Sequence, residues 1–76
     1  MDTTQLIAAL GGSDALSQRL RDRGAPYGPH ATAKWRIRGL PDSFSLRVRL
    51  MALVHETAMS DEVRAAAMDK VKEIAP

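Results

Sequence analysis

The sequence predicts an all-α protein, a compact domain of four to five helices in 76 residues. Apolar residues recur at intervals of three and four, which is the spacing of one helix face, and no stretch shows the alternation of a β-strand. Segments containing Gly or Pro interrupt this pattern, as turns between helices do. At this length we expect a single domain, residues 1–76, near the lower size limit for one hydrophobic core.

Two helices are predicted in the first third of the chain. The first contains an apolar cluster and stops at a Gly-Gly pair, residues 11–12, as a short helix with a glycine C-cap does. Ser13 is a good N-cap residue for the second helix, and Asp14 is well placed in its first turn for the helix dipole. A Gly-Ala-Pro sequence at 24–26 ends the second helix. The inward-facing residues are Leu6, Ile7 and Leu10 in the first helix and Leu16 and Leu20 in the second.

A third helix is predicted over residues 29–38. Pro29 suits the first helical position, because its φ is fixed and its missing N–H would have no partner there. The Gly-Leu-Pro sequence at 39–41 supplies the stop. Thr32 and Trp35 lie three apart on one face, and we expect Trp35 to be a core anchor. The residues that point elsewhere are His30, Ala33, Lys34 and Ile37.

The last two predicted helices differ in character. Asp42 is expected to cap a long fourth helix that is apolar on more than one face and is therefore the central core element. The apolar residues of that helix are Phe44, Leu46, Val48, Leu50, Met51, Leu53 and Val54. Ser60 followed by two acids opens a fifth helix, residues 60–75, which is amphipathic. Its apolar stripe consists of Val63, Ala67, Val71 and Ile74.

Positive charge is concentrated in the middle of the chain. The net charge is only +2, but residues 19–49 hold eight arginines and lysines against two aspartates, a net +6. Residues 1–18 and 50–76 each carry a net −2. A local excess of this kind favours a polyanionic partner, because the distribution of charge governs binding more than its sum.

Three sequence segments carry a resemblance to a known family. They are LGG at 10–12, ALSQRL at 15–20 and AKWRIRGLP at 33–41. This pattern resembles the helix-turn-helix of Cro-type phage repressors, and in particular the small YdaS-like proteins. The resemblance spans roughly residues 6–54, leaves the last helix outside, and implies a lambda-repressor-like fold.

The chain departs from that family pattern in two places. The connection from Leu20 to Gly28 is longer than the tight turn typical of the family, so the second helix is a candidate for extension. Thr32 stands where the family usually buries Val or Ile. Its hydroxyl can bond a carbonyl one turn earlier.

The resemblance implies that the third helix reads bases in the major groove of DNA. His30, Ala33 and Lys34 are then the base-reading residues. Tyr27 and Gly28 are expected near a phosphate, together with the free N–H groups of the helix start. The candidates for phosphate contact among the basic residues are Arg19, Arg21, Arg23, Arg36, Arg38, Arg47 and Arg49.

The leading functional prediction is a sequence-specific transcriptional regulator, a repressor by family resemblance, that acts as a homodimer on double-stranded DNA. Its half-sites would lie about one helical turn apart. The dimer surface is expected on the stripe of the fifth helix or on the exposed part of the fourth. Two alternatives stay open: a helical protein-interaction module, antirepressor- or antitoxin-like, and a sequence-neutral architectural DNA binder.

The composition argues against an enzyme and against a cofactor. The chain has no cysteine, and His55-Glu56 lacks the second histidine of a zinc-protease motif, because Met59 stands there. No set of residues supplies a nucleophile, a base and an oxyanion site. No apolar stretch approaches the roughly 20 residues of a membrane span, and the amino terminus is acidic. We therefore expect no metal and no membrane partner, and a cytoplasmic, nucleoid-associated protein.

Overall fold

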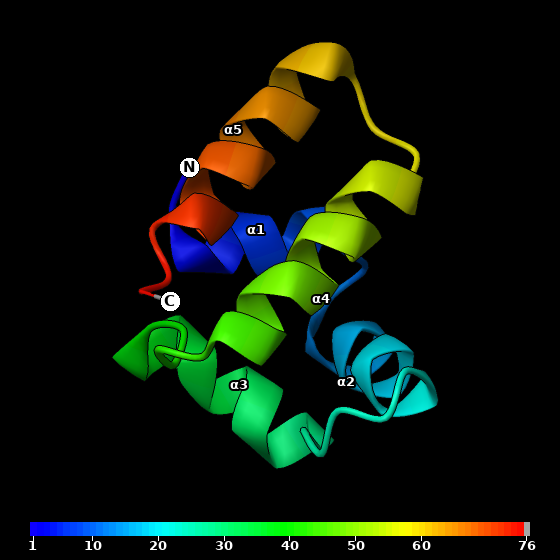
Figure 1. Cartoon of the computed structure of the whole chain (residues 1–76), viewed down its shortest axis with the longest axis vertical. Coiled ribbons are helices and arrows are strands. Elements are labelled where there is room, and N and C mark those ends of the chain that lie inside the picture. Colours follow the sequence, from blue (N-terminus) through cyan, green and yellow to red (C-terminus); the bar gives the residue numbers. More distant parts are fainter. Residues whose placement is uncertain (76) are drawn as a thin grey trace.

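The computed structural model describes residues 1–75 and confirms the all-α prediction, with five helices and no strand in that range (Figure 1). The helices α4 and α5 lie side by side, α3 runs along the lower side of the view, and α2 packs closely against α3. α1 lies between them and contacts α2, α3 and α5. The helices are α1 (Thr3–Ala9), α2 (Ser13–Asp22), α3 (Pro29–Arg38), α4 (Phe44–Glu56) and α5 (Asp61–Lys72).

A reciprocal cap and a glycine pair delimit the short α1. The Asp2 carboxylate accepts from the Gln5 N–H at 2.7 Å, and the Gln5 side chain accepts from the Asp2 N–H at 2.8 Å. At the other end Gly11 and Gly12 have φ of 107° and 95°, a region that L side chains rarely adopt. The glycine stop predicted for the first helix is therefore confirmed, and it turns the chain directly into α2.

Two predicted caps are wrong. At α2 the N-cap is Gly12, which has a positive φ, so Ser13 is the first helical residue instead of the cap. Its hydroxyl has no hydrogen-bond partner among residues 1–75. At α4 the cap is Ser43, whose hydroxyl accepts from the Leu46 N–H at 3.2 Å. Asp42 instead accepts from the Ala75 N–H at 3.3 Å and so binds the segment that follows α5. The Ser60 cap predicted for the last helix is confirmed.

The core takes residues from all five helices, but α4 contributes only one of its faces. Phe44 and Val48 are 61% and 49% exposed, although both were expected among the core-forming residues. At about 100° per residue they lie opposite the buried stripe of the same helix. The buried apolar residues are Leu6, Ile7, Leu10, Leu16, Leu20, Ala25, Trp35, Leu46, Leu50, Leu53, Val54, Ala67, Val71 and Ile74.

The last helix is an integral part of this core. Ala67 and Val71 have no exposed surface and Ile74 is 4% exposed, whereas Val63 is 37% exposed. The prediction of a dimer surface through these four residues is therefore wrong, because three of them are covered within a single chain. The domain accordingly extends well beyond residues 6–54, the range of the family resemblance.

We expect Val71→Asp to unfold the protein or to lower its free energy of unfolding by about 3 kcal/mol or more, because it places a carboxylate in the apolar core. Urea denaturation followed by far-UV circular dichroism measures this. Val63→Asp, at a partly exposed site on the same helix, is the control and should cost much less. Equal losses for both variants would contradict the packing described for α5.

Candidate nucleic-acid interface

The helix α3 has one buried face and one exposed face. Thr32 is fully buried and Trp35 is 6% exposed. Centred on the opposite side of the helix, at 3.6 residues per turn, are four side chains that all reach the surface. These four residues, which we call the α3 outer face, are His30, Ala33, Lys34 and Ile37.

Two hydrogen bonds of the Thr32 hydroxyl determine how α3 is seated. It donates to the Pro29 carbonyl at 3.1 Å, the bond one turn earlier that the sequence predicted, and the Ser13 carbonyl lies at 2.9 Å from the same oxygen. Since a hydroxyl has one proton, the two carbonyls share it. The contact with Ser13 joins α3 to the first residue of α2, so threonine here orients the two helices relative to each other.

The long connection before α3 is tied down at both ends. The Ala25 N–H donates to the Leu20 carbonyl at 2.9 Å, and the Ser17 hydroxyl donates to the Tyr27 carbonyl at 2.7 Å. The Tyr27 ring packs edge-on against Trp35, with centroids 5.1 Å apart at an angle of 69°. Residues 23–28 therefore form a connection longer than a tight turn, with α2 extended to Asp22.

The start of α3 is open. Gly28 is the N-cap and supplies no side-chain bond, and Pro29 has no N–H. The first free donors are thus the N–H groups of His30 and Ala31, at the positive end of the helix dipole. Tyr27 was expected to approach a phosphate. Its ring is half-buried and packs on Trp35, so it supports α3 and also lies next to the start of that helix.

Arginines border the α3 outer face on both sides. By helical position, Arg36 lies on one side of it and Arg38 on the other. Both are exposed, and within residues 1–75 neither they nor Lys34 take part in an ion pair. Five of the predicted contact residues thus lie on one helix, with a cation on either side of the outer face: His30, Ala33, Lys34, Arg36 and Arg38.

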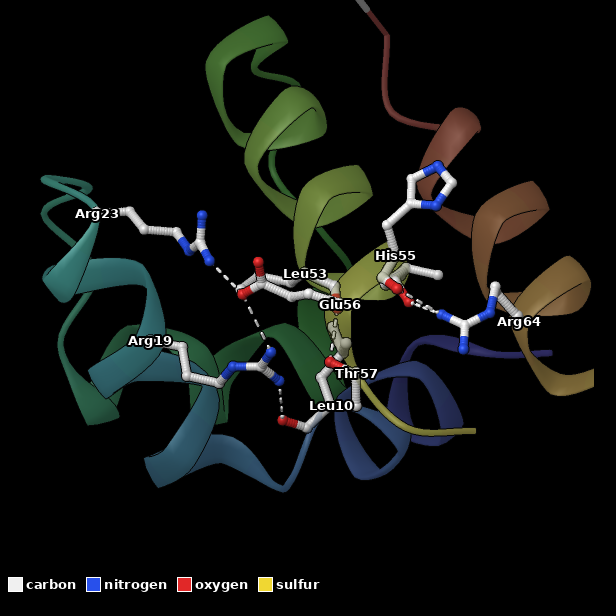
Figure 2. Close-up of polar contacts among 9 residues, drawn as sticks. Leu10, Arg19, Arg23, Leu53, His55, Glu56, Thr57 and Arg64 are labelled. Atoms are coloured by element: carbon white, nitrogen blue, oxygen red, sulfur yellow. Dashed lines mark hydrogen bonds and ion pairs between the residues drawn. The ribbon is translucent and has the colours of Figure 1, made fainter. Parts of the chain in front are cut away.

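Arg19 and Arg23 do not belong to this surface, because they bind an acid of the same chain. The guanidinium groups of Arg19 in α2 and of Arg23, the residue after α2, both point to the Glu56 carboxylate at the end of α4 (Figure 2). The Arg19 contact is 3.5 Å long. Arg19 also donates to the Leu10 carbonyl at 3.3 Å. Arg19 and Arg23, two of the seven arginines predicted as phosphate contacts, therefore link α2 to the ends of α1 and α4 and have their charges partly satisfied within the chain.

Sequence reasoning missed two residues here. Ile37 was placed away from the packed face but was not included in the site, although it is 89% exposed and completes the α3 outer face. Its spacing of seven from His30 was the available signal. Glu56 lies 33 and 37 residues from its arginines, and no local pattern indicates that ion pair.

Comparison with known proteins, and a search for membrane-spanning helices and metal-binding clusters, do not assign a function. No family model, no curated protein and no solved structure matches the chain. In residues 1–75 no helix combines the length and the apolar character needed to cross a membrane. In the same range no three His, Asp or Glu side chains gather where a metal ion would be held.

We expect Thr32→Val to lower the free energy of unfolding by about 1 kcal/mol, because the shape is kept and the hydroxyl bonds to α2 and α3 are lost. Chemical denaturation measures this. Thr4→Val, at an exposed position of α1, is the control and should change stability little. If Thr32→Val were as stable as the wild type, the hydroxyl would not contribute to seating α3.

Proposed function

We propose that this protein is a sequence-specific DNA-binding transcriptional regulator that inserts the α3 outer face into the major groove. The observation that carries the proposal is the composition of α3 around its circumference. A buried anchor holds one side, a strip of mixed hydrogen-bonding and apolar residues occupies the other, and Arg36 and Arg38 lie on either side of the strip. A helix of this width fits the major groove of B-DNA.

The α3 outer face offers the chemistry that distinguishes base pairs. Lys34 can donate to guanine O6 or N7, and His30 can donate or accept at a base edge. Ala33 and Ile37 supply apolar surface for the methyl group of thymine. Side chains that hydrogen-bond and side chains that contact methyl groups therefore alternate along one strip, which favours reading of a mixed sequence.

The flanks of α3 offer the chemistry of phosphate binding. Each of the two arginines can reach the backbone on its own side of the groove, and a guanidinium binds phosphate through two parallel bonds. The free N–H groups at the start of α3, beside Gly28, can donate to a further phosphate, because the positive end of the helix dipole attracts a negative group. These contacts position the helix without carrying sequence information.

The regulatory part of the proposal rests on the resemblance to Cro-type and YdaS-like repressors. Occupancy of an operator that overlaps a promoter would repress transcription, and the protein would be found with the nucleoid in the cytoplasm. One module of this kind buries only about 600–1,000 Å² on DNA, so tight binding calls for two copies on an inverted repeat.

Selection from a randomised duplex pool at about 150 mM salt, followed by sequencing, should enrich one motif, because non-specific attraction is weakened at that ionic strength. Lys34→Ala should lose preference at a single position of each half-site and keep the rest of the motif. Ala8→Ser, at an exposed position of α1, is the control that should leave the motif unchanged. Binding without enrichment of a motif would favour an architectural DNA binder. The absence of any binding would favour a protein-interaction module. Either result would contradict the proposal.

We expect Arg36→Ala to weaken binding to all duplexes by a similar factor and to reduce the slope of log K against log salt by about one unit, since one phosphate contact is lost. Fluorescence anisotropy at several salt concentrations measures the slope. Arg23→Ala is the matched control, because that arginine is paired with Glu56. If both variants changed the slope equally, the two arginines would not differ as the structure indicates.

A further inference from the structure

The helix α4 is apolar on two opposite sides, and only one of them is covered. The covered side is the core stripe. The other side runs the length of the helix at intervals of three and four. It comprises Phe44, Val48, Ala52 and the half-buried Met51, and it ends at the imidazole of His55. A helix that is apolar on both sides is normally buried on both. The outward side of α4 therefore calls for an occupant.

A groove continues this surface onto α5. It is open, has a volume of about 330 Å³, and lies where Met51 and His55 of α4 face α5. From α5 it is lined by Ala65 and Met68 in its middle part. The outward side of α4 and this groove together form one face, which we call the α4–α5 face.

Charges stand at the two ends of the α5 side of this face. Asp61 is the first residue of α5, Lys72 is the last, and both line the groove. They are about 16 Å apart at the rise of an α-helix. Neither forms an ion pair within residues 1–75. Along α5 this side of the groove therefore consists of an acid, two apolar residues and a base, in that order.

The remaining cation of the groove is already engaged. The Arg64 guanidinium donates to the carbonyls of Val54 and His55 and so covers the carboxyl end of α4 (Figure 2). It also donates to the Met59 carbonyl at 3.4 Å. Its charge offsets the negative end of the α4 dipole. Asp61 and Lys72 are thus the two charged residues of the groove that form no ion pair or hydrogen bond with α4, and His55 lines the groove from α4.

We propose that the α4–α5 face binds a second copy of this chain across a two-fold axis, with the two α5 helices antiparallel. A stripe with opposite charges at its ends is complementary to itself in that arrangement, since each Asp61 meets the partner's Lys72 and the methionines meet at the centre. The inference goes beyond the proposed function, because it places the dimer contact on a surface separate from α3. It rests on the proposed function only for the use of the dimer on an inverted repeat.

The test uses charge reversal and sedimentation velocity of the full chain without DNA. Wild type should show concentration-dependent association. Asp61→Lys and Lys72→Asp should each weaken self-association about tenfold or more, because each places two like-charged pairs in the interface. An equimolar mixture of the two variants should associate like the wild type, since in the mixed dimer both pairs are again oppositely charged.

Glu62→Lys is the matched control, because it makes the same change of charge in the same first turn but lies outside the groove. It should leave association unchanged, and circular dichroism should show equal helix content in all variants. A wild type that stays monomeric up to about 1 mM, a mixture that does not recover, or equal weakening by Glu62→Lys would each overturn the proposal. Because no DNA is present, these results are independent of whether α3 binds a base sequence.

Discussion

The seating of α3 by two side chains is the constraint on which the candidate interface depends. Trp35 supplies the apolar anchor, and the Thr32 hydroxyl reaches the Ser13 carbonyl of α2. Thr32 and Trp35 are the two buried residues of α3, and the Tyr27 ring packs against Trp35, so these side chains orient the helix about its own axis where it packs on α2 and α1. A small shift there would move the whole outer face, because every residue of a helix turns together.

Contacts of Glu56 and Arg64 orient the other helices relative to one another, as the Thr32 hydroxyl orients α3 relative to α2. The Glu56 carboxylate pairs with Arg19 of α2 and with Arg23 just after it, while Arg64 of α5 binds the carbonyls at that same end of α4. Exposed ion pairs contribute only about 0–1 kcal/mol each, so this cluster orients helices more than it stabilises them. It also separates the arginines that are paired within the chain from those, such as Arg36 and Arg38, that form no ion pair within residues 1–75.

Much of the fold follows from local patterns in the sequence. The bounds of α3, the glycine stop of α1 and the Ser60 cap were all predictable, because helix caps and breakers act within a few residues. The caps predicted at Ser13 and Asp42 were wrong, because the neighbouring residues Gly12 and Ser43 are the N-caps of α2 and α4. For the site, the α3 outer face could be derived from spacing, whereas the pairing of Glu56 with arginines more than 30 residues away depends on tertiary packing.

The exposure of the α3 outer face separates the proposed recognition surface from the core that drives folding. His30, Ala33, Lys34 and Ile37 all lie outside the core, and exposed substitutions generally change stability by less than about 0.5 kcal/mol. Related chains can therefore diverge at these positions without first acquiring compensating mutations in the core. The same separation makes the domain a scaffold on which a library of recognition surfaces can be displayed over one unchanged interior.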